Sequence, residues 1–146
     1  MPTNRYYTQI PELYEPRQRL KEWLVEKYPI CEFSGKRGHD LHEGLIEGND
    51  LKGLHKKSEE TQILVWSLVL HHPANVALVN HDHHLQHKPS REAFLTAVLK
   101  RPESFFQEYG LKDWTFRNAA LAYEHFKAVF ETLFEEGVFK VRISLP

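Results

Sequence analysis

Side chains that can bind a metal ion and activate water are concentrated in two short segments of this chain. Residues 75–87 read N-V-A-L-V-N-H-D-H-H-L-Q-H and hold four histidines and two asparagines around a short apolar run. Residues 38–43 read G-H-D-L-H-E and add carboxylates. Imidazole suits Zn²⁺, Mn²⁺ and Ni²⁺, whereas Mg²⁺ prefers oxygen ligands and keeps several waters. Together the two segments predict a metal-dependent hydrolase.

The secondary structure expected around these segments would bring their polar side chains together. Residues 76–79 form an apolar run of strand length, residues 40–46 are predicted to be extended, and residues 81–87 to begin a short helix. A further extended piece is expected at residues 30–33. Two strands and a helix can gather the candidate side chains, which are Asp40, His42, Glu43, Asn75, His84 and His87.

Helices are expected on both sides of this centre. Apolar residues recur at three- and four-residue steps over residues 16–28, and caps and periodicity predict helices over 58–70, 91–100 and 115–136. The last of these has a broad aromatic face, which is interpreted mainly as core. His71 and His72 precede Pro73 and are interpreted as a solvated helix end.

The order and spacing of the polar residues resemble those of the H-N-H endonucleases, whose fold is two strands and a helix around one divalent metal. C-E-F-S-G-K at residues 31–36 is similar to the family's opening, and D-L-H-E at 40–43 to its first histidine segment. Asn75 corresponds to the middle asparagine, and His84 follows nine residues later, which is the family's spacing. The resemblance spans residues 28–88, and D-L-H-E-G-L is similar to small H-N-H proteins of phages and prophages.

The resemblance implies a fold and a division of the chain. It predicts a mostly helical α+β protein in which a small ββα-metal motif lies between N-terminal and C-terminal helices. Residues 1–29 would form an N-terminal arm and helix, residues 30–88 the motif with an inserted helix, and residues 89–146 a C-terminal helical extension.

The resemblance also implies roles in the second segment. Asn75 would orient the catalytic strand and its base by hydrogen bonding rather than touch the metal. His84 would bind the metal from the helix. His87 would be a second ligand from the helix, because residues three apart share a helix face.

Two registers are open in the first segment. In one, His42 is the general base and Asp40 helps to hold the metal. In the other, His42 is a ligand and Glu43 takes the base position. We favour the second, because H-E-G-L-I aligns without a gap to the family's H-H followed by apolar residues. A glutamate base would need its pKa raised by burial.

Many H-N-H proteins also carry a structural zinc held by two C-x-x-C pairs. The corresponding positions here are Cys31, Ser34, Asn80 and His83, of which only Cys31 and His83 could bind zinc. We therefore expect no structural zinc. The one catalytic ion would be Mg²⁺, Mn²⁺, Ni²⁺ or Zn²⁺.

Composition limits the class of protein. The chain has 146 residues, a formal net charge of -1 and 41% hydrophobic residues, which fit one packed domain rather than a strongly basic nucleic-acid-coating protein. No apolar run is long enough to span a membrane, and the N-terminus lacks a signal peptide's apolar core. With a single cysteine, Cys31, no intrachain disulfide can form. The expected location is the cytoplasm of a bacterial or phage-infected cell.

The function expected first is a metal-dependent endonuclease that hydrolyses phosphodiester bonds in DNA. Basic side chains near the site in sequence could contact phosphates, namely Lys52, Lys56, Lys57, Lys88 and Arg91. Two alternatives are a catalytically inactive H-N-H-like module that binds DNA or protein, and a structural metal-binding protein of another family. A homodimer through the C-terminal helices is a further expectation.

Overall fold

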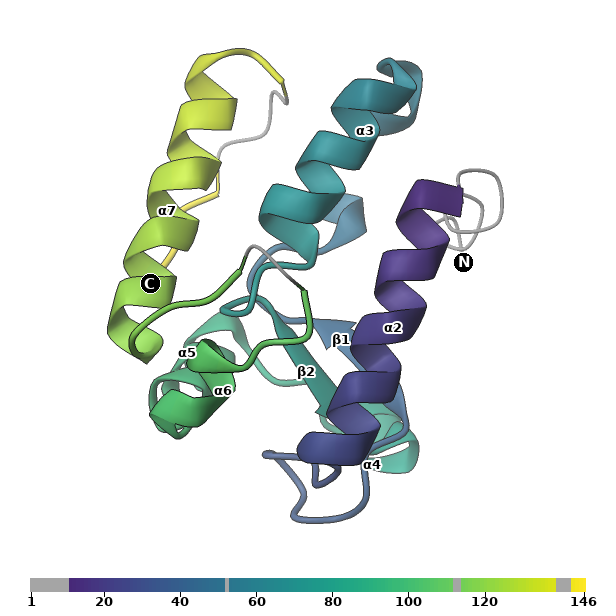
Figure 1. Cartoon of the computed structure of the whole chain (residues 1–146), viewed down its shortest axis with the longest axis vertical. Helices are drawn as coiled ribbons and strands as arrows, with labels where there is room; N and C mark the ends of the chain where they lie inside the picture. The colour runs from purple at the N-terminus through teal and green to yellow at the C-terminus, as the bar shows by residue number, and fades with distance from the viewer. Residues whose placement is uncertain (1–10, 52, 112–113, 139–142) are drawn as a thin grey trace.

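A computed structural model describes residues 11–51, 53–111, 114–138 and 143–146 of the chain. The described part is mostly helical, with one two-stranded antiparallel sheet near its middle. Helices α2 (Pro11–Lys27) and α7 (Ala119–Glu135) lie on opposite sides of the sheet (Figure 1). The mostly helical α+β prediction is confirmed. The arm expected at residues 1–10 and the phosphate contact expected at Lys52 lie outside the described residues.

The sheet pairs β1 (Asp40–Glu43) with β2 (Val76–Val79), and Asp40 lies opposite Val79. All four residues of β2 are buried, as expected of an apolar run of strand length. β1 ends three residues before the predicted end at residue 46. After β1 the Gly44 N–H still donates to the backbone carbonyl of Asn75, and the chain then leaves the sheet, where the Leu45 and Ile46 N–H groups donate to the side chain of Asn75 instead.

The prediction of a short extended piece at residues 30–33 is wrong. Ile30 forms a single bridge with Arg37, and a turn lies between them. The Cys31 N–H donates to the carbonyl of Lys36 at 2.7 Å, and Gly35 takes a positive φ of 72°. Glycine tolerates this backbone conformation without steric cost, so the segment closes into a compact loop rather than a strand.

The first helix, α2, begins at Pro11 rather than at residue 16. Proline is tolerated in the first turn of a helix because the N–H groups there have no partner within the helix. Pro16 has no N–H to donate to the carbonyl of Glu12, four residues earlier, and Glu12 is exposed. Leu20 and Leu24, which are 0% and 1% exposed, anchor the helix in the core.

The helix predicted over residues 58–70 consists of two parts. Two 3-10 turns, η1 (Gly48–Asp50) and η2 (Leu54–Lys56), precede it. α3 (Glu59–Val65) is capped by the Ser58 hydroxyl, which accepts from the Thr61 N–H at 3.2 Å. The chain then continues as a π-helix, η3 (Trp66–Leu70), which leads towards β2.

After β2 the chain forms α4 (His81–Gln86), α5 (Arg91–Leu99), α6 (Glu103–Gln107) and α7. The predictions for α4 and α5 agree closely with the structure, whereas α6 was not predicted. α7 begins four residues after its predicted start at residue 115, because the Asn118 side chain accepts from the Leu121 N–H and caps the helix. Asparagine is a favoured N-cap residue.

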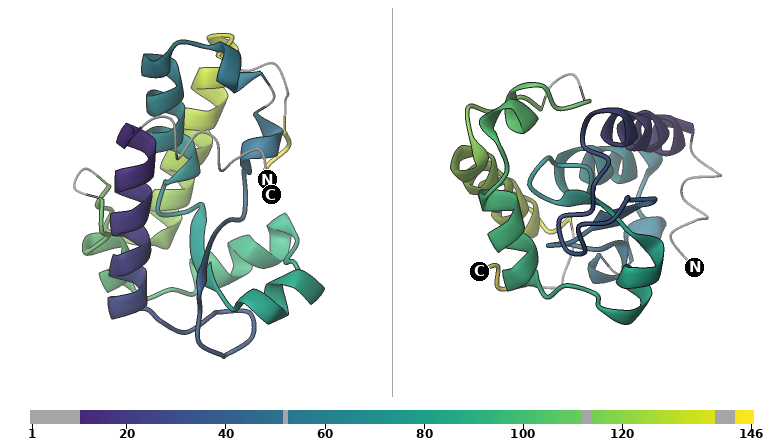
Figure 2. Two further views of the ribbon diagram at one scale, coloured as in Figure 1. Left: turned by 90° about the vertical axis from the view of Figure 1, so that its right-hand side faces the viewer. Right: turned by 90° about the horizontal axis from the view of Figure 1, so that it is seen from below.

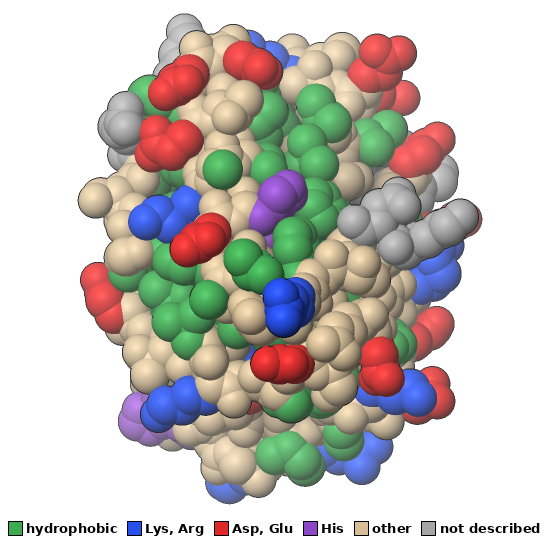
Figure 3. Space-filling view, turned by 60° about the vertical axis from the view of Figure 1, so that its left-hand side comes forward, with side chains coloured by type: hydrophobic (Ala, Val, Ile, Leu, Met, Phe, Trp, Pro, Cys, Tyr) green, Lys and Arg blue, Asp and Glu red, His purple; other side chains and the backbone are tan. Residues whose placement is uncertain are grey.

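The aromatic face of α7 packs into the core of its own chain. Phe126 and Phe130 are fully buried, and α7 contacts η3, α5 and α6. Two further views show the strands enclosed between α2 and the C-terminal helices (Figure 2). The face that suggested a homodimer is thus covered within the chain, and the side of the molecule carrying α7 mixes hydrophobic with charged side chains (Figure 3). None of the described helices is long and apolar enough to cross a membrane.

Candidate metal centre

The structure brings together one histidine from each of the two polar segments. His42 lies on β1 and His84 on α4, and their ring centroids are 4.4 Å apart with 57° between the planes. His42 is only 7% exposed, and the ring of Phe94 packs against it at 5.7 Å. A strand and the following helix therefore present two imidazoles to each other, with one aromatic ring packed against His42.

Each imidazole has one buried ring nitrogen without a hydrogen-bond partner among the described residues. These atoms are Nε2 of His42 and Nδ1 of His84. A buried polar atom without a partner costs about 1–3 kcal/mol, so such atoms are rare away from functional sites. Two such nitrogens on facing rings are suited to bind one ion together, because the nitrogen of a neutral imidazole is a common metal ligand.

The electrostatics keep both rings neutral. Burial, the neighbouring His84 and the charge of Lys88 lower the pKa of His42 to about 3. Burial and Lys88 also lower the pKa of His84, although the charges of Asp40 and Glu47 act in the opposite direction. A metal ligand must be deprotonated, so both rings are ready to bind at neutral pH.

The start of α4 fixes the position of His84. The Asn80 side chain caps the helix by accepting from the His83 N–H at 3.1 Å, and it donates to the carbonyl of Arg37 at 2.9 Å. The His84 N–H donates to the carbonyl of Asn80 at 2.9 Å. Asn80 thus ties the helix to the loop that precedes β1.

Asn75 fixes the position of the segment that follows β1. It is fully buried, and its Oδ1 accepts from the N–H groups of Leu45 and Ile46 at 2.9 and 2.8 Å. Its Nδ2 donates to the carbonyls of Ile46 and Leu70 at 2.9 and 3.1 Å. All of these side-chain hydrogen bonds are to backbone groups, so Asn75 joins the segment after β1 to the end of η3.

Asp40 lies on the same face of β1 as His42, since alternate strand residues share a face. Its carboxylate bonds to Nδ1 of His81, at 2.5 Å. This hydrogen bond and the charge of Asp40 raise the pKa of His81. Asp40 is therefore close to the two imidazoles but is held by a third histidine.

Glu43 is not brought together with His42 and His84. It is the strand neighbour of His42, so its side chain emerges on the opposite face of the sheet. There its charge contributes to raising the pKa of the buried Tyr109, which burial chiefly causes. The register that makes Glu43 the base is not supported by this placement.

His87 also points elsewhere. It is the exposed C-cap residue of α4, and its ring packs against His83 with centroids 5.0 Å apart. α4 ends at Gln86, so His87 does not have helical backbone geometry and does not share a helix face with His84.

Two ion pairs that were not predicted join the segment after β1 to the part of the chain after α4. Lys88 forms an ion pair with Glu47, and Arg91 bonds to Asp50 at 3.0 Å. Arg91 also donates to the carbonyl of Leu45 at 2.7 Å. A cavity of about 250 Å³ opens here, lined by Gly44, Glu47, Lys88, Pro89, Ser90 and Arg91. Glu47 was not among the residues predicted for the site, because no motif or periodicity in its segment distinguishes it.

The carboxylates near the histidines are thus engaged by other side chains. Within the described ranges, no group of three or more His, Cys, Asp or Glu side chains is arranged to hold a metal ion. The two imidazoles form an open pair, with Asp40 held by His81 and Glu47 held by Lys88.

The remaining basic residues predicted to contact phosphate lie away from this region. Lys56 and Lys57 precede α3, whose beginning lies at the end of the molecule away from α4 (Figure 1). Of the four that the structure describes, Lys88 is close enough for its charge to act on both histidines, and Arg91 lines a cavity together with Lys88.

The positions that correspond to the family's zinc knuckle are also close together. Burial disfavours ionisation of the Cys31 thiol, but hydrogen bonds from the Ser34 side chain and from backbone groups, including that of Asn80, outweigh it and lower the pKa. Cys31 therefore lies close to Ser34 and to the backbone of Asn80, and its thiol is buried.

His71 and His72 are buried, so their interpretation as a solvated helix end was wrong. They are 2% and 0% exposed. Tyr109 donates to the carbonyl of His71 at 2.5 Å. Nδ1 of His72 accepts from the Ala74 N–H at 3.1 Å, and its Nε2 lies 3.2 Å from Nδ1 of His125. Burial is the main cause that lowers the pKa of both histidines, with smaller contributions from the charge of Arg17 at His71 and from the neighbouring His125 at His72.

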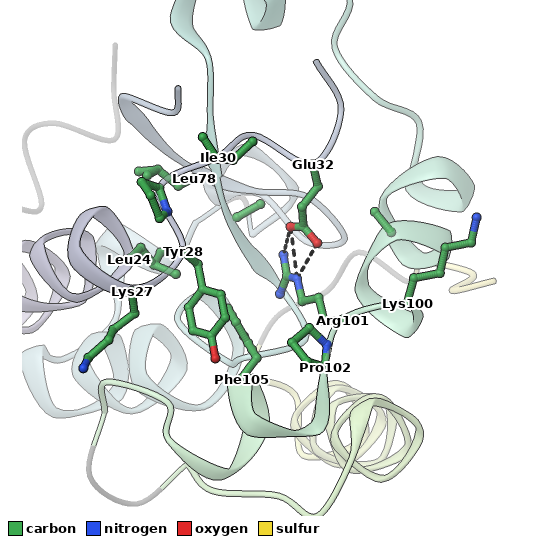
Figure 4. A pocket seen from close by; sticks show the side chains of 13 residues that line it. Leu24, Lys27, Tyr28, Ile30, Glu32, Leu78, Lys100, Arg101, Pro102 and Phe105 are labelled. Atoms are coloured by element: carbon green, nitrogen blue, oxygen red, sulfur yellow. Dashed lines mark hydrogen bonds and ion pairs between the residues drawn. The ribbon is translucent and has the colours of Figure 1, made fainter. Parts of the chain in front are cut away.

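A second, larger cavity lies at the outer edge of β2. It has a volume of about 540 Å³, and Arg101 and Glu32 meet inside it (Figure 4). Arg101 donates to both carboxylate oxygens of Glu32 and to the carbonyls of Pro73 and Val76 at 3.2 and 2.8 Å. This contact braces β2 from the edge opposite β1, and we interpret it as structural.

Comparison of the chain with family models, with curated proteins and with solved structures finds no match.

Proposed function

We propose that the chain is a metal-dependent nuclease in which His42 and His84 hold one divalent ion and a phosphodiester bond of DNA is hydrolysed beside it. The observation that carries this proposal is the facing pair of neutral imidazoles, 4.4 Å apart, each with a buried unpartnered nitrogen. Structural histidines in a core normally find partners for their ring nitrogens.

The two histidines would act as ligands, and the ion would supply a Lewis acid that stabilises charge developing on the phosphate. His42 suits the ligand role better than the base role, because a pKa of about 3 makes it a weak proton acceptor at neutral pH. Asp40, on the same face of β1, supplies a carboxylate next to the ligands. Asn75 holds the end of β1 in place through its bonds to Leu45 and Ile46.

The resemblance to H-N-H endonucleases adds support of a different kind. The chain forms two antiparallel strands followed directly by a helix, with Asn75 just before the second strand and His84 on the helix. Cys31, Ser34 and Asn80 lie together where members of that family hold a structural zinc. This order of elements supports an H-N-H-like motif.

A non-catalytic module that binds DNA or protein is the second candidate. It is favoured by the placement of Glu43 on the other face of β1, and by the ion pairs that occupy the carboxylates of Asp40 and Glu47. Such a module would keep the fold and lose the reaction.

Cleavage of supercoiled plasmid DNA in Mn²⁺, Mg²⁺, Ni²⁺ or Zn²⁺ tests the proposal. Wild type should nick the plasmid in at least one metal, and His42→Ala and His84→Ala should each lower the rate by at least a hundredfold. The matched control, His55→Ala, changes an exposed histidine outside the site and should leave the rate unchanged. Equal cleavage by wild type and His84→Ala would refute the site, whereas DNA binding without cleavage in any metal would favour the second candidate.

A further inference from the structure

The cavity at the outer edge of β2 has walls that are mostly apolar. Its volume of about 540 Å³ lies within the range of roughly 300–1,000 Å³ that is typical of sites for small organic molecules. The rings of Tyr28 and Phe105 lie side by side in its wall, with centroids 4.9 Å apart (Figure 4). Ile30 also lines the cavity and is 54% exposed, although it is a large aliphatic residue. An apolar molecule bound in the cavity would cover this side chain.

Contacts among the surrounding residues fix the shape of this wall. Trp23 packs against both rings, with its centroid 5.4 Å from that of Tyr28 and 5.6 Å from that of Phe105. The guanidinium group of Arg101 lies over the ring of Phe105, 4.4 Å from its centroid, and is held there by Glu32. A molecule that enters a preformed cavity does not have to order the side chains that contact it, so less of its binding free energy is lost.

The charged residues that line the cavity are mostly cations. Three of them, Lys27, Lys100 and Arg101, face a single carboxylate, that of Glu32. Arg101 pairs with Glu32, whereas neither lysine forms an ion pair with another residue that the structure describes. Both lysines are exposed, so their ammonium groups lie where the cavity meets solvent. The excess positive charge favours a negatively charged ligand.

The two lysines lie on different sides of the cavity. Figure 4 shows Lys100 on the side of Arg101 and Glu32, and Lys27 across from them beside Tyr28. An anion beside Lys100 would also meet the carboxylate of Glu32, which would repel it. Lys27 lies across the cavity from that carboxylate, and its flexible stem lets the ammonium group turn over the mouth. Lys27 is therefore the better partner for an anion.

We propose that this cavity binds a free amphiphile with one carboxylate group and an apolar body, such as a medium-chain fatty acid. The apolar body lies against the rings of Tyr28 and Phe105, and the carboxylate pairs with the ammonium group of Lys27 at the mouth. The described residues that line the cavity include neither His42 nor His84. The binding site is thus separate from the candidate metal centre and does not depend on the proposed nuclease activity.

The test is titration calorimetry of the full chain with octanoate, octanol and octylammonium. These three compounds share one alkyl chain and differ in the charge of the head group. Octanoate should bind about fivefold more tightly than octanol, since an exposed ion pair contributes an effect of this size. Octylammonium should bind most weakly, because the cations that line the cavity repel its head group.

Variants at the mouth of the cavity locate the ligand. Lys27→Gln should weaken the binding of octanoate about fivefold and leave the binding of octanol unchanged. Ile30→Glu places a negative charge at an exposed position of the wall and should weaken the binding of octanoate further. Lys56→Gln and Leu64→Glu change exposed residues outside the cavity, so these matched controls should bind like wild type. Circular dichroism melting establishes that each variant is folded.

Each contrary outcome refutes a defined part of the proposal. If octanoate binds no more tightly than octanol, the ligand class is wrong. If Lys100→Gln weakens the binding of octanoate and Lys27→Gln does not, the carboxylate does not pair with Lys27. If Ile30→Glu binds octanoate like wild type, or if octanoate does not bind to wild type, the cavity is not the site. None of these outcomes bears on the cleavage of DNA.

Discussion

The imidazole of His42 on β1 faces the imidazole of His84 on α4, with ring centroids 4.4 Å apart. The contact depends on the hydrogen bonds of two asparagines. Asn75 holds the end of β1, and Asn80 caps the helix that carries His84. The site is therefore a product of the fold around it, and its stability can be tested apart from its chemistry.

Buried histidines should make the protein sensitive to acid. The pKa values of His42 and His71 are lowered to about 3, and that of His72 is lowered as well, chiefly by burial. An unfolded chain binds protons at these positions near pH 6.5, whereas the folded chain does not. The free energy of unfolding should therefore fall as pH falls from 6.5 towards 3, by up to about 1.4 kcal/mol per pH unit for each such histidine.

Urea unfolding at several pH values between 4 and 7 measures this slope. His42→Gln should make the slope shallower, while the exposed His87→Gln should leave it unchanged. A stability that does not change from pH 7 to pH 4 would contradict the burial of these groups.

Asn75→Ala should be strongly destabilising. The substitution leaves the N–H groups of Leu45 and Ile46 and the carbonyls of Ile46 and Leu70 without their buried partner. Losses of this kind cost about 1–3 kcal/mol each when unrelieved, so we expect a total of about 3–4 kcal/mol after relaxation. Chemical denaturation should show this loss, with less than about 0.5 kcal/mol for the exposed control Asn49→Ala. Equal stabilities of the two variants would show that the bonds are not made.

Gly44→Ala should separate α5 from β1. A Cβ at this position would lie 1.9 Å from Cδ2 of Phe94, whose ring also packs on His42. Overpacking of a core typically costs about 1–3 kcal/mol. Thermal unfolding should show this loss, and the double variant Gly44→Ala/Phe94→Leu should be less destabilised than the sum of its single changes. Additive losses would mean that the two residues do not touch.

Arg101→Leu should weaken the outer edge of β2. The guanidinium side chain is 4% exposed and donates to Glu32 and to the carbonyls of Pro73 and Val76. Its removal leaves a carboxylate and two carbonyls without their donor, and we expect a loss of about 2–4 kcal/mol. Lys100→Leu, at the exposed neighbouring position, supplies the control and should change denaturant stability little. A loss confined to the control would overturn the role given to Arg101.

A substitution at Glu43 distinguishes between the two registers of the first polar segment. Its side chain emerges on the face of β1 opposite His42, so Glu43→Gln should retain metal binding and most cleavage of plasmid DNA. His42→Gln should lose both. If Glu43→Gln abolished cleavage while metal binding remained, Glu43 would be the base and the strand would have to turn during the reaction.

The parts of the fold that local chemistry determines could be predicted from the sequence. The run of four apolar residues specifies β2, and Ser90 caps α5 as expected. The start of α7 was misplaced because Asn118 was not recognised as its cap. Within the site, order and spacing singled out Asn75, His42 and His84, which the structure connects through short elements.

The rest depends on contacts between residues far apart in sequence. His71 and His72 look like a polar helix end, yet they are buried, and they contact Tyr109, which follows α6, and His125 on α7. The pairing of Glu47 with Lys88 likewise arises only when the segment after β1 folds against the end of α4. No periodicity or motif in the sequence records such contacts.

The measurement that tests the central claim most directly is an anomalous difference map from a crystal grown with Mn²⁺. The account predicts one strong peak between Nε2 of His42 and Nδ1 of His84, about 2.0–2.3 Å from each nitrogen. It also predicts that the peak disappears in crystals of His84→Ala. A peak only at the neighbouring pair His83 and His87, or none at a saturating metal concentration, would contradict a metal centre at His42 and His84.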